Sequence, residues 1–282
     1  MIYFKTNEEI DLIRESCLLV SRTLAEIALY IQPGISTLEL DRIAETFIRN
    51  NNGKPGFLGY QGYPNTLCTS VNNTVVHGIP SAYKIKDGDI VSIDCGVLLN
   101  GWYGDSCYTF MVGNVPEREE TLCRATYRSL EDAITAAIEG NRLGDIGHAV
   151  QRHAERHHFS IVRDLVGHGI GRNLHEEPAV ANYGKPGRGV KLRRGMVIAV
   201  EPMLNSGKPG VVTEDDGWTV KTVDGESSAH FEHTLVVREG KAEKLSTFNF
   251  IEEAIKKNNF LWQNSFYRTR WNHYRSVVKR YV

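Results

Sequence analysis

The chain has 282 residues, 41% of them hydrophobic and 24% charged, which is the composition of an ordinary soluble globular protein. A formal net charge of −1 gives no general attraction to nucleic acid or membranes, and no apolar run is long enough for a membrane span. Five cysteines without a CxxC pair argue against a disulfide framework and a cysteine zinc knuckle. The N-terminus lacks the regions of a secretory signal. We therefore expect a cytoplasmic protein that does not contact membranes.

Two amphipathic helices are predicted at the N-terminal end. Thr6 and Glu9 have capping-box spacing ahead of a segment with helical apolar periodicity. The Pro-Gly pair at 33–34 ends this helix. A second helix begins after Ser36 and ends at the asparagine run 50–52.

A β-hairpin is predicted over residues 89–112. The first arm is rich in apolar and β-branched residues, and Asn100-Gly101 is a strong signal for a two-residue hairpin turn. With such a turn, Leu99 pairs with Trp102, and the pairing of all earlier residues follows from that register.

This register makes a prediction about two acidic residues. Asp105 lies opposite Gly96, and Asp94 lies one diagonal step away on the same face of the hairpin. Diagonal neighbours have Cβ atoms roughly 7–8 Å apart, so both carboxylates would reach cations held between them. Either residue alone would more commonly face solvent at a turn or a strand end.

The remaining sequence repeats the same order of elements. Two helices are expected at 117–139 and 143–157. Short strands are expected at 161–166, 196–203, 218–222 and 230–237. Because helix–helix–strands occurs twice, we expect a duplicated α+β body, although no repeat is visible residue by residue.

Three further polar residues lie in apolar or glycine-rich segments. His168 is flanked by glycines, Glu201 ends an apolar run, and Glu232 begins another. One such histidine alone would normally be a core residue bonded to backbone. Buried charges of one sign are costly unless a cation neutralises them. Together with Asp94 and Asp105, these residues therefore have the composition of a ligand set for a two-metal hydrolytic site.

Short motifs occur around these residues in a fixed order along the chain. They are the segment 76–80 (VHGIP), the hairpin with its two aspartates, 167–171 (GHGIG), 175–176 (HE), 201–202 (EP) and 231–234 (FEHT). Together they resemble the type I methionine aminopeptidases of peptidase family M24, from about residue 2 to residue 245. The resemblance implies the α+β pita-bread fold, in which pseudo-two-fold duplicated halves surround a central antiparallel sheet. It also implies a catalytic domain over 1–247 and a C-terminal extension over 248–282.

The resemblance further implies the site residues and their roles. The metal ligands would be Asp94, Asp105, His168, Glu201 and Glu232. They would hold two divalent cations (Co, Mn, Fe(II) or Zn), with Asp105 and Glu232 bridging, and a metal-activated hydroxide would attack the substrate. His77 and His175 would contact the substrate amide and stabilise the developing oxyanion. Glu201 would carry a proton to the leaving amine.

A pocket for the methionine side chain is also implied. It would be lined by Tyr60, Tyr63, Cys68, His77, Leu174 and Trp218, since soft and aromatic groups suit a thioether, and His175 would bind the substrate beside it. For the two tyrosines, ordinary core packing is an equally good explanation. The chain departs from the family at two positions: Leu174 stands where many relatives have Phe, and His230 where Gln is usual.

The implied activity is removal of the N-terminal methionine from nascent polypeptides with a small second residue, by a monomeric enzyme. Two alternatives remain open. One is a peptidase of the Xaa-Pro type, which shares the fold and the ligands. The other is a metal-free binding module with this fold. The presence of all five ligand residues disfavours the module.

The C-terminal extension differs from the body in composition. From Phe250 onward it has seven Lys or Arg against two Asp or Glu, and eight of the chain's 26 aromatic residues. One interpretation is an element that docks on ribosomal RNA, because basic groups bind phosphate and aromatic rings stack on bases. The other is an amphipathic helix packed on the body or in a dimer. So many aromatic residues favour the packed helix.

Overall fold

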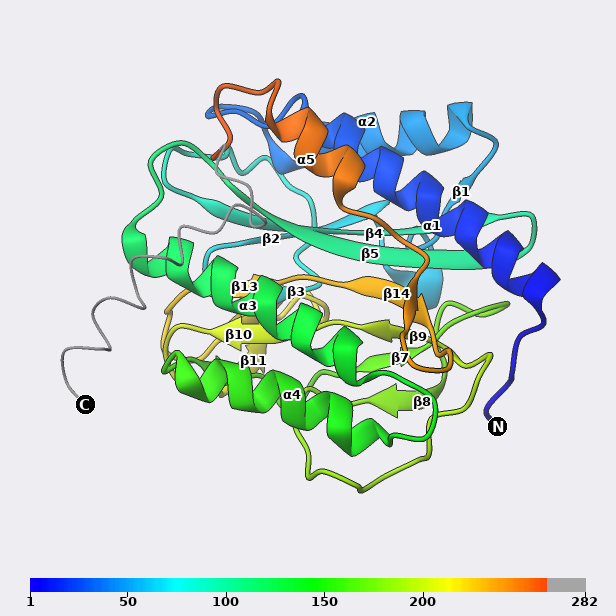
Figure 1. Ribbon diagram of the computed structural model, residues 1–282. Coiled ribbons are helices and arrows are strands. Elements are labelled where there is room, and N and C mark those ends of the chain that lie inside the picture. Colours follow the sequence, from blue (N-terminus) through cyan, green and yellow to red (C-terminus); the bar gives the residue numbers. More distant parts are fainter. Residues whose placement is uncertain (263–282) are drawn as a thin grey trace.

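The computed structural model describes residues 1–262, and the basic part of the extension, 263–282, lies outside the described residues (Figure 1). The helices are α1 (Asn7–Ala28), α2 (Thr37–Asn50), α3 (Glu117–Ala136), α4 (Leu143–Arg156) and α5 (Asn249–Ile255), with a 3-10 helix at Tyr60–Gly62. The strands are β1 (Lys54–Pro55), β2 (Leu67–Val71), β3 (Thr74–Val76), β4 (Ile90–Leu99), β5 (Trp102–Met111), β6 (Ser160–Ile161), β7 (Gly167–Gly169), β8 (Glu176–Val180), β9 (Val197–Val200), β10 (Met203–Asn205), β11 (Val211–Thr213), β12 (Val220–Thr222), β13 (Ser228–His230), β14 (His233–Val236) and β15 (Glu243–Lys244).

The two halves of the chain have similar layers. Helix α1 covers the β4–β5 hairpin and α2 lies beside it against β1 and β2 of the same sheet, while α3 and α4 pack together along the strands of the second half (Figure 1). All the strand pairs are antiparallel within residues 1–262. This arrangement confirms the expected α+β fold of two corresponding halves.

The predicted N-terminal helices are confirmed together with their caps. The Thr6 hydroxyl accepts from the backbone N–H of Glu9, and the Glu9 carboxylate accepts from the backbone N–H of Thr6. At α2 the Ser36 hydroxyl accepts from the backbone N–H of Glu39. Each cap satisfies a donor that the helix itself leaves unpaired.

The predicted hairpin register is also confirmed. Leu99 pairs with Trp102, and Gly96 pairs with Asp105. Asn100 and Gly101 have φ values of 53° and 80°, as a type I′ turn requires at both central residues.

Gly104 lets α1 lie directly on this hairpin. A Cβ at this position would lie 2.4 Å from the backbone nitrogen of Cys17 and 2.6 Å from the carbonyl carbon of Ser16. No side chain fits there unless the helix moves away from β5. The α1 helix therefore covers the outer face of the sheet and leaves the opposite face to the site.

The strands predicted at 196–203 and 230–237 are each divided, at the glutamates that the sequence placed at the end of one apolar run and at the start of another. The first divides into β9 and β10 at Glu201-Pro202, and the second into β13 and β14 at Phe231-Glu232. β9 pairs with β14 in a five-stranded sheet, whereas β10 pairs with β13 in a separate sheet. The two breaks lie opposite each other: the pair His233–Val200 precedes them in one sheet, and the pair Met203–His230 follows them in the other. The predicted strand at 161–166 is likewise too long, because β6 ends at Ile161.

This double break has a physical cause and a consequence. Pro202 has no N–H to donate, so the ladder cannot continue through it. The backbone N–H of Glu232 instead donates to the Cys107 carbonyl on β5, at 2.9 Å. The second half is thereby attached to the β4–β5 hairpin, and the side chains of the two glutamates lie where the sheets meet.

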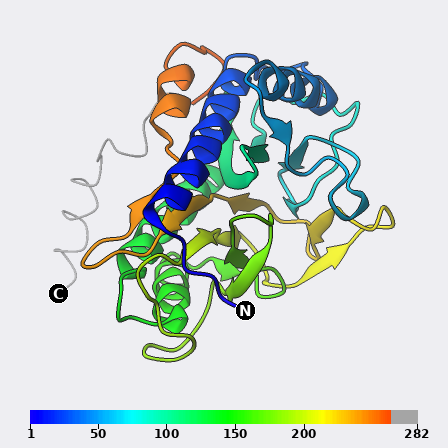
Figure 2. The same cartoon turned by 90° about the vertical axis from the view of Figure 1, so that its right-hand side faces the viewer.

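The described part of the extension packs on the body. Helix α5 lies beside α1 (Figure 2), and Phe248, Ile251 and Leu261 are buried in the main core. The Asn258 side chain donates to the carbonyls of Ala28 and Ile31 at 2.7 Å each. The predicted domain boundary at residue 247 remains a prediction. Within residues 1–262, none of the helices combines the length and apolar character that a membrane span requires.

Candidate metal centre and substrate pocket

A cavity of about 220 Å³ opens between the two halves. All the predicted site residues line this one cavity: Tyr60, Tyr63, Cys68, His77, Asp94, Asp105, His168, Leu174, His175, Glu201, Trp218 and Glu232. The tertiary structure thus brings together residues that are up to 172 positions apart, from Tyr60 to Glu232. Their catalytic and binding roles remain predictions.

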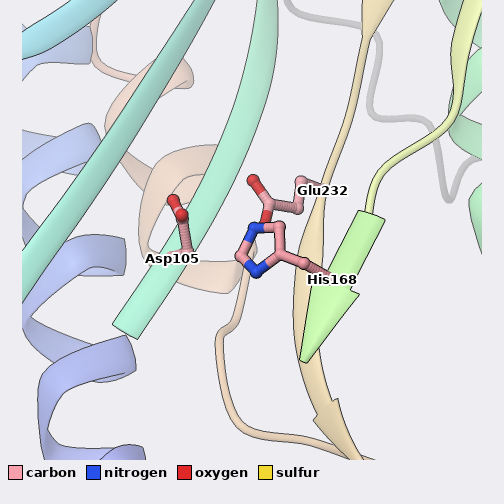
Figure 3. Close-up of side chains that lie close together, drawn as sticks. All are labelled: Asp105, His168 and Glu232. Carbon is pink, nitrogen blue, oxygen red and sulfur yellow. The ribbon is translucent and has the colours of Figure 1, made fainter. Parts of the chain in front are cut away.

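Three of the proposed ligands lie close enough to share one cation. The ligand atoms of Asp105, His168 and Glu232 all lie within 4.8 Å of one another (Figure 3). Asp105 comes from β5, His168 from β7, and Glu232 from the break between β13 and β14. Figure 3 shows the three side chains pointing toward one another from these separate elements.

The other two carboxylates adjoin this cluster. Asp94 faces the site from the strand next to Asp105, in the diagonal position that the register predicts. An oxygen of Glu201, Oε1, lies 3.6 Å from Nε2 of His168. Four carboxylates and one imidazole therefore line the same cavity.

The burial of these carboxylates is costly without a cation. Burial raises the pKa of Asp94, Asp105, Glu201 and Glu232, and their mutual repulsion raises those of the last three further. Oδ1 of Asp94, Oδ1 of Asp105 and Oε1 of Glu232 are buried without a hydrogen-bond partner. Divalent cations prefer oxygen and imidazole ligands of this kind. The residues present therefore fit a divalent metal.

His168 is prepared as a ligand by its surroundings. Its Nδ1 lies 2.9 Å from the carbonyl oxygen of Gly169, which assigns the ring proton to Nδ1 and leaves the Nε2 lone pair toward the carboxylates. Burial, followed by the neighbouring His175, lowers the pKa of His168 to about 3. The ring is therefore neutral at physiological pH, as metal ligation requires.

Two more histidines face the cavity beside the carboxylate cluster. The ring centroids of His175 and His168 are 4.2 Å apart, and Nδ1 of His175 lies 2.8 Å from the Tyr60 hydroxyl. His77 has φ of 56°, an unfavourable conformation for a non-glycine residue that is typical of functional sites. Burial, followed by His175, lowers the pKa of His77 to about 4.

The rest of the cavity wall is apolar and aromatic. Leu174 and Cys68 are 1% and 5% exposed, and Cys68 pairs directly with Asp94 across β2 and β4. The edges of Tyr63 and His77 each meet Trp218, with ring centroids 5.2 and 6.3 Å away. The Tyr63 hydroxyl donates to the carbonyl of Leu67 at 2.9 Å, so this tyrosine also has a structural role.

The cavity has wall residues that the sequence did not single out. They are Phe57, Gln61, Val76, Leu165, Val166 and Met203. Most are ordinary apolar residues with no sequence signal. Gln61 has φ of 49°, but nothing in a glutamine between Tyr60 and Gly62 predicts that conformation. His230, noted as a departure from the family, places Nε2 3.7 Å from Oε2 of Glu201.

Comparison with known proteins agrees with this geometry. The sequence profile of metallopeptidase family M24 matches residues 11–239. A methionine aminopeptidase of Clostridium perfringens is 52% identical over 237 residues, which are 84% of this chain and 95% of the relative. The chain belongs to metallopeptidase family M24. As a metallopeptidase it is a hydrolase that works with a divalent metal.

Solved structures of M24 proteins give the same result at the level of the fold. The methionine aminopeptidase of Rickettsia prowazekii has a TM-score of 0.86 and 41% identity, and the match covers 88% of this chain and all (100%) of that one. A prolidase of Pyrococcus furiosus has a TM-score of 0.69 at 22% identity, over 86% of this chain and 65% of that one. The prolidase likeness shows the fold alone, and the pita-bread fold expected from the sequence is confirmed.

Proposed function

We propose that this protein removes the N-terminal methionine from nascent proteins and peptides whose second residue is small. The observation that carries this proposal is the convergence of four carboxylates and one imidazole on a cavity that also contains His77, His175 and Trp218. The 52% identity to a protein named methionine aminopeptidase supports it further. The Xaa-Pro alternative has weaker support, since the solved prolidase is 22% identical.

The ligand set is proposed to hold two divalent cations. Asp94, Asp105, His168, Glu201 and Glu232 would hold them. Bound cations at such a site supply Lewis acidity and lower the pKa of water. Co, Mn, Fe(II) and Zn all suit this mixture of carboxylate and imidazole.

The histidines act as neutral hydrogen-bond donors in this proposal. With the Tyr60 hydroxyl donating to Nδ1 of His175, the proton of the neutral ring lies on Nε2. The lowered pKa values of His77 and His175, caused chiefly by burial, keep both rings neutral at pH 7. Their N–H groups then stabilise the negative oxygen that develops on the substrate carbonyl.

Glu201 is proposed to carry the proton to the leaving amine. Burial and the neighbouring Asp94 raise its pKa well above the ordinary value of a glutamate. A raised pKa brings a carboxyl group closer to the solution pH, where proton transfer in both directions is efficient. The free amine of the substrate would lie near the acidic residues, which makes the cleavage specific for the N-terminal bond.

Peptide hydrolysis tests the proposal directly. Purified protein with Mn, Co or Fe(II) is incubated with Met-Ala-Xaa and Met-Gly-Xaa peptides and, in parallel, with Xaa-Pro peptides. Release of free methionine, abolished by a chelator and in Glu201→Ala, is the expected result. Cleavage before proline would replace the proposal with the Xaa-Pro activity. No bound metal and no hydrolysis of either peptide class would leave a binding module.

Residence in the cytoplasm and a monomeric state are also part of the proposal, and contact with the ribosome is the less favoured of the two interpretations of the extension. The basic residues that would bind ribosomal RNA lie in 263–282, outside the described residues. Co-sedimentation of ribosomes with the full chain and with a 263–282 deletion, at low and moderate salt, tests that contact. Equal pelleting of the two proteins would contradict it.

A further inference from the structure

The segment before α1 lies against the loop that carries His175. The backbone N–H of Lys5 donates to the Gly195 carbonyl at 2.8 Å, which attaches this segment to the second half of the molecule. Lys5 is only 9% exposed. Lysine is almost never so buried unless its ammonium group is paired.

The partner of this ammonium group is the residue next to His175. Nζ of Lys5 lies 2.5 Å from Oε2 of Glu176, and the two side chains are 5% and 6% exposed. The other oxygen, Oε1 of Glu176, accepts from the backbone N–H of Asn173 at 3.1 Å. One carboxylate therefore joins the N-terminal segment to the short loop that ends at His175.

Gly171 shows how closely this contact is packed. A Cβ at Gly171 would lie 2.6 Å from Cε of Lys5 and 2.8 Å from Oε1 of Glu176. The Gly171 carbonyl in turn accepts from the backbone N–H of Tyr103 on β5, at 2.8 Å. The ion pair therefore has a fixed position relative to the hairpin that carries Asp105.

Within residues 1–262, the ring of His175 has one hydrogen bond to a side chain, to the hydroxyl of the partly buried Tyr60. The centroid of this ring lies 4.2 Å from that of His168, and the position of the ring depends on the position of the loop backbone that carries it. The buried ion pair holds this backbone together with the pairing of Glu176 and Gly169 across β8 and β7.

We propose that Lys5 is a positioning residue, which acts through Glu176 to hold His175 in its place beside the metal centre. The proposal rests on the proposed function of His175 in stabilising the developing oxyanion. Without the ammonium group, the buried carboxylate of Glu176 has no counter-charge, and breaking such a pair is strongly unfavourable. The loop that ends at His175 then has no tether to the N-terminal segment, and it shifts away from its place beside the metal centre.

Kinetics of Lys5→Met test this role. The substitution keeps the length of the side chain and removes its charge. We expect kcat/KM for a Met-Ala-Xaa peptide to fall about 10–100-fold, the usual effect of losing a partner that orients a site residue. Most of the loss should be in kcat, because His175 acts on the transition state. Lys244→Met is the matched control, because it removes a 2.9 Å pair with Glu131 that is 32% and 29% exposed.

A double variant separates positioning from stability. Lys5→Met leaves a buried anion and Glu176→Gln leaves a buried cation, whereas the combined variant leaves neither. We expect the thermal midpoint to recover in the combined variant while kcat stays low, since the tether is still absent. Recovery of kcat together with the midpoint would show a purely structural role and overturn the proposal.

The ring of His175 provides a readout that does not depend on activity. In metal-free protein, the histidine ring signals in the NMR spectrum are assigned by comparison with His175→Ala. We expect the His175 signals to shift in Lys5→Met and to stay unchanged in Lys244→Met. Unchanged signals in both would contradict the proposal. If the wild type releases no methionine, the proposed function fails, while these spectra still decide whether Lys5 positions His175.

Discussion

Asp105 pairs directly with Gly96 across the β4–β5 hairpin, and Asp94 lies one diagonal step away on the same face. A two-residue turn fixes this relation, so neither carboxylate can leave the site without a shift of the whole register. Both contribute a buried oxygen that lacks a hydrogen-bond partner. Their placement on one rigid hairpin gives the metal centre a preformed half, which the second half of the chain completes with His168, Glu201 and Glu232.

Asp105→Asn should weaken metal binding by more than about 100-fold. Loss of a residue that only hydrogen-bonds to a metal ligand costs about 10–100-fold in affinity, and loss of a direct ligand should cost more. Asparagine keeps the shape of the side chain and removes its charge. Isothermal titration of metal-free protein with Mn²⁺ measures the effect. Glu214→Gln changes an acidic residue on the exposed β11–β12 loop and serves as the control. Equal affinities in the two variants would exclude Asp105 as a ligand.

The stability of the metal-free protein should fall as the pH rises above about 6.5. Unfolded Asp and Glu titrate near pH 3.9 and 4.3, whereas burial raises the pKa of Asp94, Asp105 and Glu232 in the folded state. The folded protein then binds more protons, and each carboxyl group lowers the unfolding free energy by up to about 1.4 kcal/mol per pH unit. This loss continues until the pH passes the folded pKa.

The buried histidines oppose this trend only at lower pH. Burial lowers the pKa of His168 and His230 to about 3 each, whereas unfolded histidine titrates near pH 6.5. The stability that these neutral rings contribute to the folded protein is therefore lost only as the pH falls below about 6.5. Urea denaturation with a chelator at pH 6.5 and pH 8 therefore separates the effect of the carboxylates from that of the histidines. We expect the slope to flatten in Asp105→Asn. A wild-type stability that rises over this interval would contradict the burial argument.

Gly104→Ala should destabilise the fold by about 1–3 kcal/mol, the usual cost of overpacking a core. Its Cβ would meet the backbone of α1 at Cys17, 2.4 Å away, and a backbone cannot swing aside as a side chain can. Urea midpoints give the difference. At Gly34 a Cβ meets nothing within 4 Å, and its φ of +96° adds backbone strain alone. Gly34→Ala should therefore cost less, and the opposite order would contradict this packing.

Deleting residues 248–282 should destabilise the body much more than deleting 263–282. The longer deletion removes Phe248, Ile251 and Leu261 from the core, at about 1.5–3 kcal/mol for each buried side chain. The shorter deletion keeps all three and is the matched control. Thermal denaturation of both truncated proteins measures the difference. Equal midpoints would support an independent catalytic domain that ends near residue 247.

The sequence was sufficient to predict those features that depend on local chemistry. Capping residues such as Thr6 and Ser36 are read from spacing of a few positions, and the Asn100-Gly101 turn fixes the hairpin register because its backbone twist matches that of the strands. The positions of Glu201 and Glu232 at the ends of apolar runs were predicted, but the passage of the chain into a different sheet at each was not, since the end of a run does not show which sheet the next strand joins. The proposed site residues were recognised from motifs, and the resemblance supplied their roles.

Two relations among the site residues were set by tertiary structure alone. Glu201 and Glu232 meet the aspartate pair because two sheets join at their strand breaks, a contact between segments far apart in the chain. Lys5 meets Glu176 across 171 positions, and nothing in the N-terminal sequence distinguishes this lysine from an exposed one. Local sequence determines caps and turns because the side chains involved hydrogen-bond to backbone groups only a few residues away. Which charges are buried together depends on how the finished elements pack, and only the folded structure decides that.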